Sequence, residues 1–129
     1  MSSSEICTHG VRVHVDAEYV PDLSNPSQGL WLFGYTIRIT NETRETLQLL
    51  ARHWHIVDAT GHEEEVRGRG VVGEQPTIGP GDEFVYSSRC ILRTPSGSMH
   101  GTYLMTTASG EQFEADIARF RLMEPMAIH

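Results

Sequence analysis

Residues 67–73 have the composition of an anion-binding loop, because three glycines alternate there with two arginines. The spacing Gly68-x-Gly70-x-x-Gly73 also occurs in dinucleotide-binding proteins, where the third glycine lies in a helix that faces the pyrophosphate. The eight residues that follow, 74–81, contain two prolines and two glycines, which exclude such a helix. The dinucleotide-binding fold is therefore excluded.

Two interpretations of this segment remain. The glycines could serve backbone geometry, because glycine permits the bulges, turns and close approaches found at strand ends. Alternatively, exposed amides beside two guanidinium groups could form an anion-binding site for a phosphate or a carboxylate. The candidate ligand-binding residues are then Arg67, Gly68, Arg69, Gly70 and Gly73.

A second candidate site is the pair His53 and His55, which flank Trp54. Alternate residues of a strand share a face, so the two imidazoles would lie about 7 Å apart. Such a pair can bind a transition metal if a third ligand arrives, and His62 and residues 63–65, all glutamate, follow across the next turn. Cobalt would accept the imidazoles, whereas magnesium would prefer the carboxylates. The alternative is that Trp54 faces the core and the histidines merely face water.

No combination of side chains predicts a catalytic site. All ten basic residues are arginine, and the absence of lysine excludes Schiff-base chemistry and the lysine of a phosphate-binding P-loop. Cys90 alternates in phase with Phe84 and Tyr86, so we expect a core thiol rather than a nucleophile. Ser96 and Ser98 lack a nucleophile elbow and a paired base. We therefore expect that the chain is not an enzyme.

The composition is that of one ordinary globular domain, with 129 residues, 39% hydrophobic and 21% charged. Its formal net charge of −7 argues against binding to nucleic acid or to an anionic membrane. No apolar run approaches the roughly 20 residues of a membrane-spanning helix. Two distant cysteines without an apolar signal segment indicate a reducing compartment, so we expect a cytoplasmic protein.

Apolar and polar residues alternate with a period of two along most of the chain, which predicts strands. The clearest case is residues 11–19, whose apolar side chains should face the core together with Trp31, Phe33 and Tyr35. The predicted strands are 11–19, 30–39, 46–57, 64–71, 84–92, 101–107 and 112–122. About seven strands separated by turns predict an all-β antiparallel sandwich of the fibronectin type III or immunoglobulin-like kind. We expect the domain to span residues 11–125, between a flexible N-terminus at 1–10 and a flexible C-terminus at 126–129.

The run Gly70-Val-Val-Gly-Glu-Gln-Pro76, followed by Ile78-x-Pro80-Gly81, resembles the ApaG family of small bacterial proteins. So do Thr94-Pro95-x-Gly97-x-Met99-x-Gly101-x-Tyr103-x-Met105 and the segment Arg52-His53-Trp54. The resemblance covers nearly the whole chain. It implies a fibronectin type III-like sandwich and an association with tolerance to, or efflux of, magnesium and cobalt. Related domains in eukaryotic F-box and polymerase-interacting proteins imply a protein-binding module, and the glycine motif implies a link to pyrophosphate-containing ligands.

The leading hypothesis is therefore a non-enzymatic binding or adaptor domain with an unidentified protein partner. The loop between Gly73 and Gly81 is the expected docking segment, with apolar surface from Val71, Val72 and Ile78 and a rim of arginines. One alternative is a small-ligand sensor that binds a pyrophosphate-containing nucleotide at residues 68–73. Another is direct binding of a divalent metal by the two histidines at 53 and 55; no other cofactor is expected.

Overall fold

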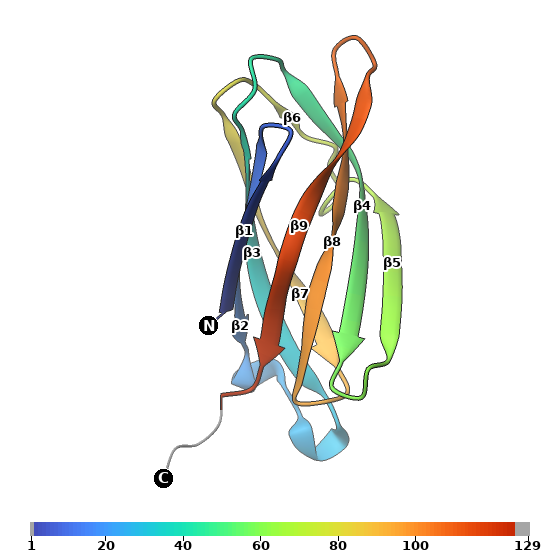
Figure 1. The fold of residues 1–129 in the computed structure, drawn as a ribbon. Coiled ribbons are helices and arrows are strands. Elements are labelled where there is room, and N and C mark those ends of the chain that lie inside the picture. Colours follow the sequence, from blue (N-terminus) through green and yellow to red (C-terminus); the bar gives the residue numbers. More distant parts are fainter. Residues whose placement is uncertain (1, 126–129) are drawn as a thin grey trace.

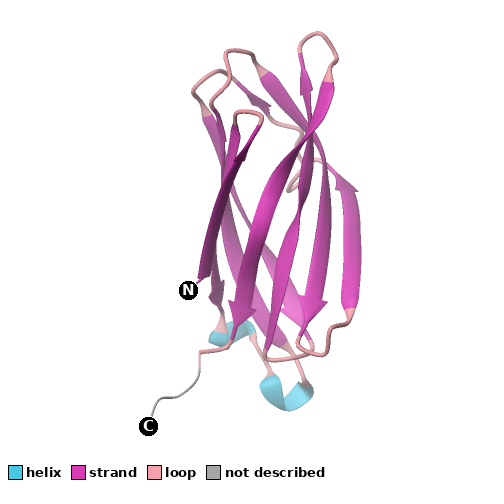
Figure 2. Ribbon diagram, in the orientation of Figure 1, coloured by secondary structure: helices cyan, strands magenta, loops and turns pink. Residues whose placement is uncertain are grey.

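The computed structural model describes residues 2–125, which form two packed antiparallel sheets (Figures 1 and 2). One sheet has the strand order β1-β2-β3-β7; the other has the order β5-β4-β8-β9, with the short β6 also paired to β4. The strands are β1 (Ser2–Thr8), β2 (Val11–Tyr19), β3 (Trp31–Asn41), β4 (Leu47–Asp58), β5 (Glu63–Arg69), β6 (Thr77–Ile78), β7 (Glu83–Leu92), β8 (Ser96–Thr107) and β9 (Gln112–Met123). The 3₁₀ turns η1 (Pro21–Leu23) and η2 (Pro26–Gln28) connect β2 to β3. The predicted antiparallel β-sandwich is confirmed.

The alternating pattern of β2 places its apolar side chains between the sheets. Val11, Val13, Val15 and Ala17 are buried, and Tyr19 is half-buried against the core. From β3, Phe33 and Tyr35 are buried and Trp31 is half-buried. A shift in register by one residue would turn every one of these side chains to the other face, so their burial confirms the predicted strand.

The two cysteines are free thiols in different environments. Cys7 is exposed, whereas Cys90 is buried between the sheets. Burial raises the pKa of the Cys90 thiol to about 12, and the nearby carboxylate of Glu64 acts in the same direction. Cys90 therefore stays protonated at neutral pH, and the prediction of a core thiol rather than a nucleophile is confirmed for its placement.

The N-terminal segment departs from the predicted fold. The sequence predicts a flexible end over residues 1–10, but Ser2–Thr8 forms strand β1, which pairs with residues 11–17 of β2. Its side chains alternate between exposed and half-buried, with few apolar residues, so the segment carries a weak strand pattern of its own. Only the neighbouring strands make it a strand. The predicted flexible C-terminus at 126–129 lies outside the described residues.

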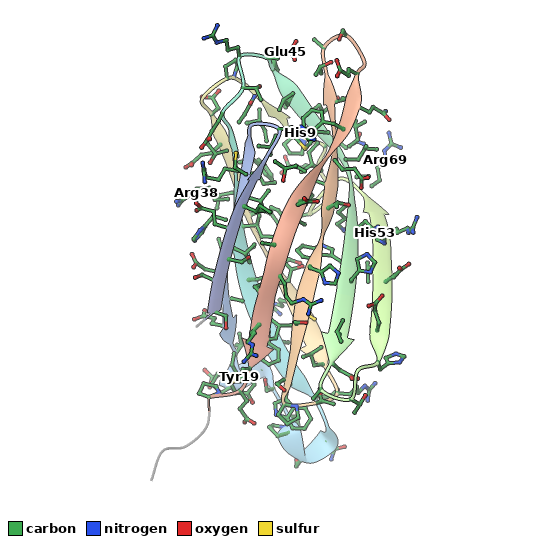
Figure 3. The ribbon with its side chains drawn as sticks, viewed as in Figure 1. His9, Tyr19, Arg38, Glu45, His53 and Arg69 are labelled. Atoms are coloured by element: carbon green, nitrogen blue, oxygen red, sulfur yellow. The ribbon has the colours of Figure 1, made fainter. Side chains whose placement is uncertain are left out.

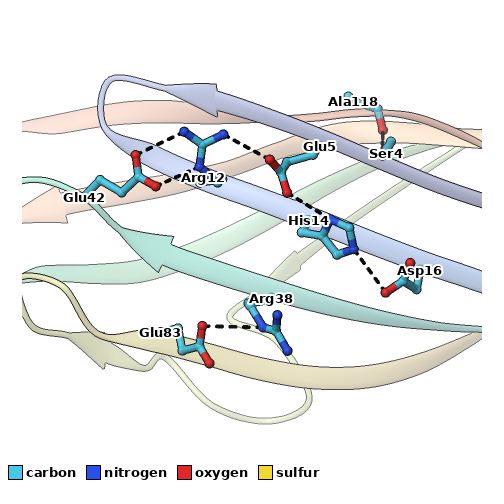
Figure 4. A network of polar contacts seen from close by, with 9 residues as sticks. All are labelled: Ser4, Glu5, Arg12, His14, Asp16, Arg38, Glu42, Glu83 and Ala118. Carbon is cyan, nitrogen blue, oxygen red and sulfur yellow. Dashed lines mark hydrogen bonds and ion pairs between the residues drawn. The ribbon is translucent and has the colours of Figure 1, made fainter.

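Polar contacts hold β1 on both sides (Figure 4). The Arg12 guanidinium of β2 donates hydrogen bonds to Glu5 of β1 and to Glu42 after β3, with N–O distances of 3.1 and 2.7 Å. On the other side, the Ser4 hydroxyl donates to the carbonyl of Ala118 in β9 at 2.8 Å. β1 therefore closes one side of the sandwich by linking the two sheets.

Helices contribute little to this fold. Among residues 2–125, the structure contains no helix that is long and apolar enough to span a membrane.

Candidate functional site

His53 and His55 lie on the outer face of β4, because Trp54 between them points into the core. Figure 3 labels His53 on this face. Trp54 is only 3% exposed, and its indole contacts the rings of Tyr35, Tyr103 and Phe120. The two imidazole rings are half-buried, and their centroids are 4.5 Å apart. They lean together more closely than the strand spacing of about 7 Å requires.

The neighbouring strand β5 places two carboxylates beside this pair. Nδ1 of His55 is 3.2 Å from Glu63 and 3.5 Å from Glu65. Nε2 of His53 is 3.8 Å from the other oxygen of Glu65. One ligand atom from each of His53, His55 and Glu65 lies within 4.8 Å of the other two, so these three side chains form a candidate metal site.

The other two residues considered as a third ligand lie elsewhere. Glu64 has the opposite orientation along β5 and lines a depression at the side of the sandwich together with Cys90. His62 is exposed in the turn before β5, where its amide donates to the Asp58 carboxylate at 3.1 Å. The alternation of β5 therefore selects Glu63 and Glu65.

A third histidine, His100, completes the cluster from β8. Its ring stacks on that of His55, with centroids 4.8 Å apart and an angle of 5° between the planes. Burial lowers the pKa of His100, and the nearby His55 and Arg119 lower it further, so its ring is neutral at neutral pH. The sequence predicts a strand only from residue 101, but β8 begins at Ser96. The apolar residue Met99, which is buried in the structure, was a sequence signal that this strand begins before residue 101. The pairing of His100 with His55 could not be predicted from the sequence.

Two nitrogen atoms of this histidine cluster are buried without a hydrogen-bond partner among the described residues: Nε2 of His53 and Nδ1 of His100. A buried polar atom without a partner is energetically unfavourable, by about 1–3 kcal/mol for an ordinary group. An unprotonated imidazole nitrogen in this position can accept a hydrogen bond or coordinate a metal ion. Of these two nitrogens, Nε2 of His53 belongs to a residue of the candidate metal site, so this site includes an imidazole nitrogen without a hydrogen-bond partner among the described residues.

The predicted anion-binding segment adjoins the histidines. Two shallow depressions of about 510 and 530 Å³ lie side by side on this outer face and share His53, Thr102 and Glu114. The first extends to Arg67 and Arg69 of β5 and the second to His100. The two candidate sites predicted from the sequence thus form one continuous surface.

The glycines of this segment have structural reasons that differ by position. Gly68 lies beneath the side chain of Arg52, whose Nη1 donates to the carbonyl groups of Arg69 and Gly70 at 3.1 and 2.8 Å. Gly70 has a φ of +64°, and a Cβ atom there would lie 2.1 Å from the carbonyl oxygen of Glu74. A positive φ and a close approach to backbone therefore account for Gly70 without a ligand, whereas a Cβ atom at Gly68 would meet the flexible side chain of Arg52.

A tight turn follows at residues 70–74. The amide of Val71 donates to the Glu74 carbonyl at 2.8 Å, and the reverse bond is 2.9 Å. Val72 and Gly73, at the centre, have positive φ values of 43° and 80°, as in a type I′ turn. Because the amides of residues 70, 71 and 74 are bonded within the protein, few remain for an anion. The nucleotide-binding residues stay a prediction.

The structure corrects the apolar surface predicted for the docking loop. Val71 and Ile78 are 0% and 2% exposed, because the turn directs Val71 inward and β6 pairs Ile78 with Leu47. Val72, at the tip of the turn, is 53% exposed. Of the three predicted apolar residues, Val72 alone faces solvent.

The family model and the named relatives that match this chain indicate the same protein family. The ApaG domain family, DUF525, matches residues 21–107. A protein named ApaG from Methylobacterium sp. (strain 4-46) is 51% identical over 118 residues, which are 92% of this chain and 91% of the relative. ApaG from Acidovorax sp. (strain JS42) is 52% identical over 112 residues, covering 87% and 82%. The crystal structure of the ApaA protein from Bordetella pertussis superposes with a TM-score of 0.88 at 44% identity, covering 95% of this chain and 99% of that one.

Proposed function

This chain belongs to the ApaG domain family, and we propose that it is a non-enzymatic binding domain whose ligand is a first-row transition-metal ion. Membership confirms the resemblance read from the sequence, and it does not itself assign a ligand. The observation that carries the proposal is the convergence of ligand atoms from His53, His55 and Glu65 within 4.8 Å of one another.

The donor set determines which metal fits. Bonds of about 2.0–2.1 Å in a tetrahedral site place neighbouring ligand atoms roughly 3.3 Å apart, so rotations of these half-buried side chains would close the site. Coordination would give Nε2 of His53 the partner that it lacks. Two imidazoles favour zinc, cobalt, nickel or copper over magnesium, which prefers oxygen ligands. A direct role in cobalt tolerance would follow from this chemistry, whereas a magnesium response would need another route.

Metal binding is tested by calorimetric titration with Zn²⁺ and Co²⁺ and by NMR. We expect shifts confined to the residues around His53, His55 and Glu65, and weak binding of Mg²⁺. We expect His53→Ala to reduce the affinity for Zn²⁺ by more than about a hundredfold. Loss of a residue that only hydrogen-bonds a metal ligand typically reduces the affinity by about 10- to 100-fold, and loss of a ligand should reduce it more. Cobalt should show the visible absorption of a low-symmetry site with nitrogen ligands.

A matched control is His14→Ala. His14 also lies between two carboxylates on an outer sheet face, 3.0 Å from Glu5 and 3.1 Å from Asp16. Unchanged Zn²⁺ binding by His53→Ala, or an equal loss in His14→Ala, would contradict the proposed site. Shifts at residues 68–73 on addition of a diadenosine polyphosphate would instead support the nucleotide alternative.

A second candidate function, the adaptor role, is favoured by the conformation of Val72. A β-branched residue with positive φ is a strained outlier, at a cost of order 1–3 kcal/mol, and such strain clusters at functional sites. Val72 is also half-exposed beside the exposed arginines 67 and 69. We propose that this tip and its arginines dock an acidic surface of a protein partner. The two free cysteines support the expectation that this takes place in the reducing cytoplasm.

The adaptor role predicts opposite effects on stability and on partner binding. Val72→Asn should raise the free energy of unfolding by about 1 kcal/mol, because asparagine tolerates the left-handed conformation. The same variant, and Arg67→Glu with Arg69→Glu, should recover less partner in a pull-down while remaining folded, since exposed arginines contribute little to stability. Arg44→Glu, an exposed site elsewhere, serves as the control. Equal partner recovery by the wild type, Val72→Asn, the double arginine variant and Arg44→Glu would refute this docking site.

A further inference from the structure

The edge strands of the two sheets are protected to different degrees. Exposed edges offer unpaired backbone groups to other strands, so proteins cover them or guard them with charge. β1 and β9 cover each other, since the Asp116 amide donates to the Thr8 hydroxyl at 3.2 Å and Ser4 bonds to Ala118. β5 carries three consecutive glutamates. β7 is the end strand of its sheet, and among the described residues no strand other than β3 pairs with it. Its charged residues, Glu83 and Arg89, are separated along the strand and opposite in sign.

β7 has the features of a pairing edge. It has ten residues without proline or glycine, and it pairs with β3 in continuous register. Val85 and Ile91 on its outer face are 47% and 59% exposed, and they are two of the five exposed large apolar side chains among the described residues. Glu83 lies at one end of the strand and Arg93 just beyond the other. The strand therefore carries an apolar pair between opposite charges.

We propose that β7 is a self-association edge, at which a second copy of this chain adds antiparallel about a two-fold axis at Ser88. This register joins the four-stranded sheets of the two copies into one continuous sheet. It places Val85 opposite Ile91 of the second copy and Glu83 opposite Arg93 of the second copy, and the symmetry repeats both pairs. Directly opposite apolar pairs and opposite charges stabilise antiparallel strands. This inference is independent of the metal site, which lies on the other sheet.

Self-complementarity is what identifies the second copy as the occupant. A strand pairs with itself favourably only if residues at equal distances from the axis match. Two of the three outer-face pairs around Ser88 do so, and the third sets Ser87 opposite Arg89, which brings no like charges directly opposite one another. On the inner face the same register sets Tyr86 opposite Cys90 of the second copy, a large side chain against a small one. The second copy would also shield the depression of about 300 Å³ between β7 and β5, whose lining includes Trp54.

The self-association is tested by sedimentation velocity from micromolar to millimolar concentrations. We expect the wild-type chain, of 14.4 kDa, to shift towards twice this mass as its concentration rises. Glu83→Arg and Arg93→Glu should each weaken the dimer at least tenfold, because each places like charges opposite one another twice. An equimolar mixture of the two variants should restore the dimer, since both opposed pairs then have opposite charges.

Controls separate this edge from other surfaces. Glu111→Arg makes the same charge change in the turn before β9, and Met123→Lys alters an exposed apolar residue at the end of β9; both should dimerise like the wild type. Val85→Lys should dissociate the dimer while circular dichroism shows an intact fold. A wild-type chain that stays monomeric at all concentrations overturns the proposal. So does a dimer that Val85→Lys leaves intact, or a mixture of the charge variants that stays monomeric.

Discussion

Gly70→Ala should lower the free energy of unfolding by about 3 kcal/mol, which is a large part of the 5–15 kcal/mol typical of a domain. The φ of Gly70 is +64°, and an L-residue in this left-handed region costs about 1–2 kcal/mol. The added Cβ would also lie 2.1 Å from the Glu74 carbonyl oxygen, and overpacking adds about 1–3 kcal/mol. Because the obstacle is backbone, relief requires the whole turn to move. Urea denaturation followed by tryptophan fluorescence measures the loss.

Two other glycines of the same segment are matched controls. Gly73 has a φ of +80°, but a Cβ there would meet nothing within 4 Å, so Gly73→Ala should cost only about 1–2 kcal/mol. At Gly68 a Cβ would meet the guanidinium of Arg52, and this group can move away because the Arg52 side chain is flexible. Gly68→Ala should therefore cost less than Gly70→Ala. If Gly70→Ala is as stable as Gly73→Ala, steric exclusion by Glu74 is wrong. If Gly70→Ala is fully stable, the structural account of this glycine fails.

The strands with clear alternation could be predicted because burial alone fixes their pattern. In β2 every second residue is apolar from Val11 to Ala17, and a period of two has one structural meaning. The position of Trp54 between two outward histidines follows from the same rule. Local pattern was sufficient for strands such as β2, in which one face lies in the core and the alternation is unbroken.

The rest depends on contacts between distant parts of the chain. β1 has a weak alternating pattern. It forms a strand because its backbone pairs with β2 and the Ser4 hydroxyl donates a hydrogen bond to the Ala118 carbonyl. His100 reaches the candidate site because β8 pairs with β4 in a register that sets it beside His55. A period of two tells which face a residue occupies and leaves open which residue of another strand lies beside it. The glutamates showed the same limit: alternation separates Glu64 from Glu63 and Glu65, and the pairing of β5 with β4 brings the latter two beside the histidines.

The glycine segment illustrates a different limit. Its composition fits both a tight turn and an anion site, because both require small residues and exposed backbone. The distinction lies in φ values and in the partners of each amide, such as the bond from Gly70 to the Leu50 carbonyl at 2.8 Å. The composition of this segment shows that many backbone conformations are allowed, but it does not determine which φ values and hydrogen bonds the backbone adopts.

The core and the candidate metal site are linked through one residue. Trp54 occupies the inward position between His53 and His55, so its anchoring in the core fixes the direction of both imidazoles. The ring of Phe120 contacts it from β9, and that of Tyr35 contacts it from the other sheet. Loss of this anchor would affect both stability and the outward geometry of β4.

Trp54→Ala should therefore lower the free energy of unfolding by about 3–5 kcal/mol, as expected when a buried aromatic side chain leaves a cavity. Trp54→Phe keeps most of the volume and should cost clearly less. Trp31→Ala is the matched control. Trp31 is half-buried at the start of β3, where its indole N–H donates to Glu124 at 3.1 Å, so its loss should cost less than that of Trp54. Chemical denaturation followed by circular dichroism compares the three variants without relying on the tryptophan signal. At a temperature where Trp54→Ala is still folded, its affinity for Zn²⁺ should fall relative to Trp31→Ala. Equal Zn²⁺ affinities of the two variants would show that the imidazoles keep their geometry without this anchor.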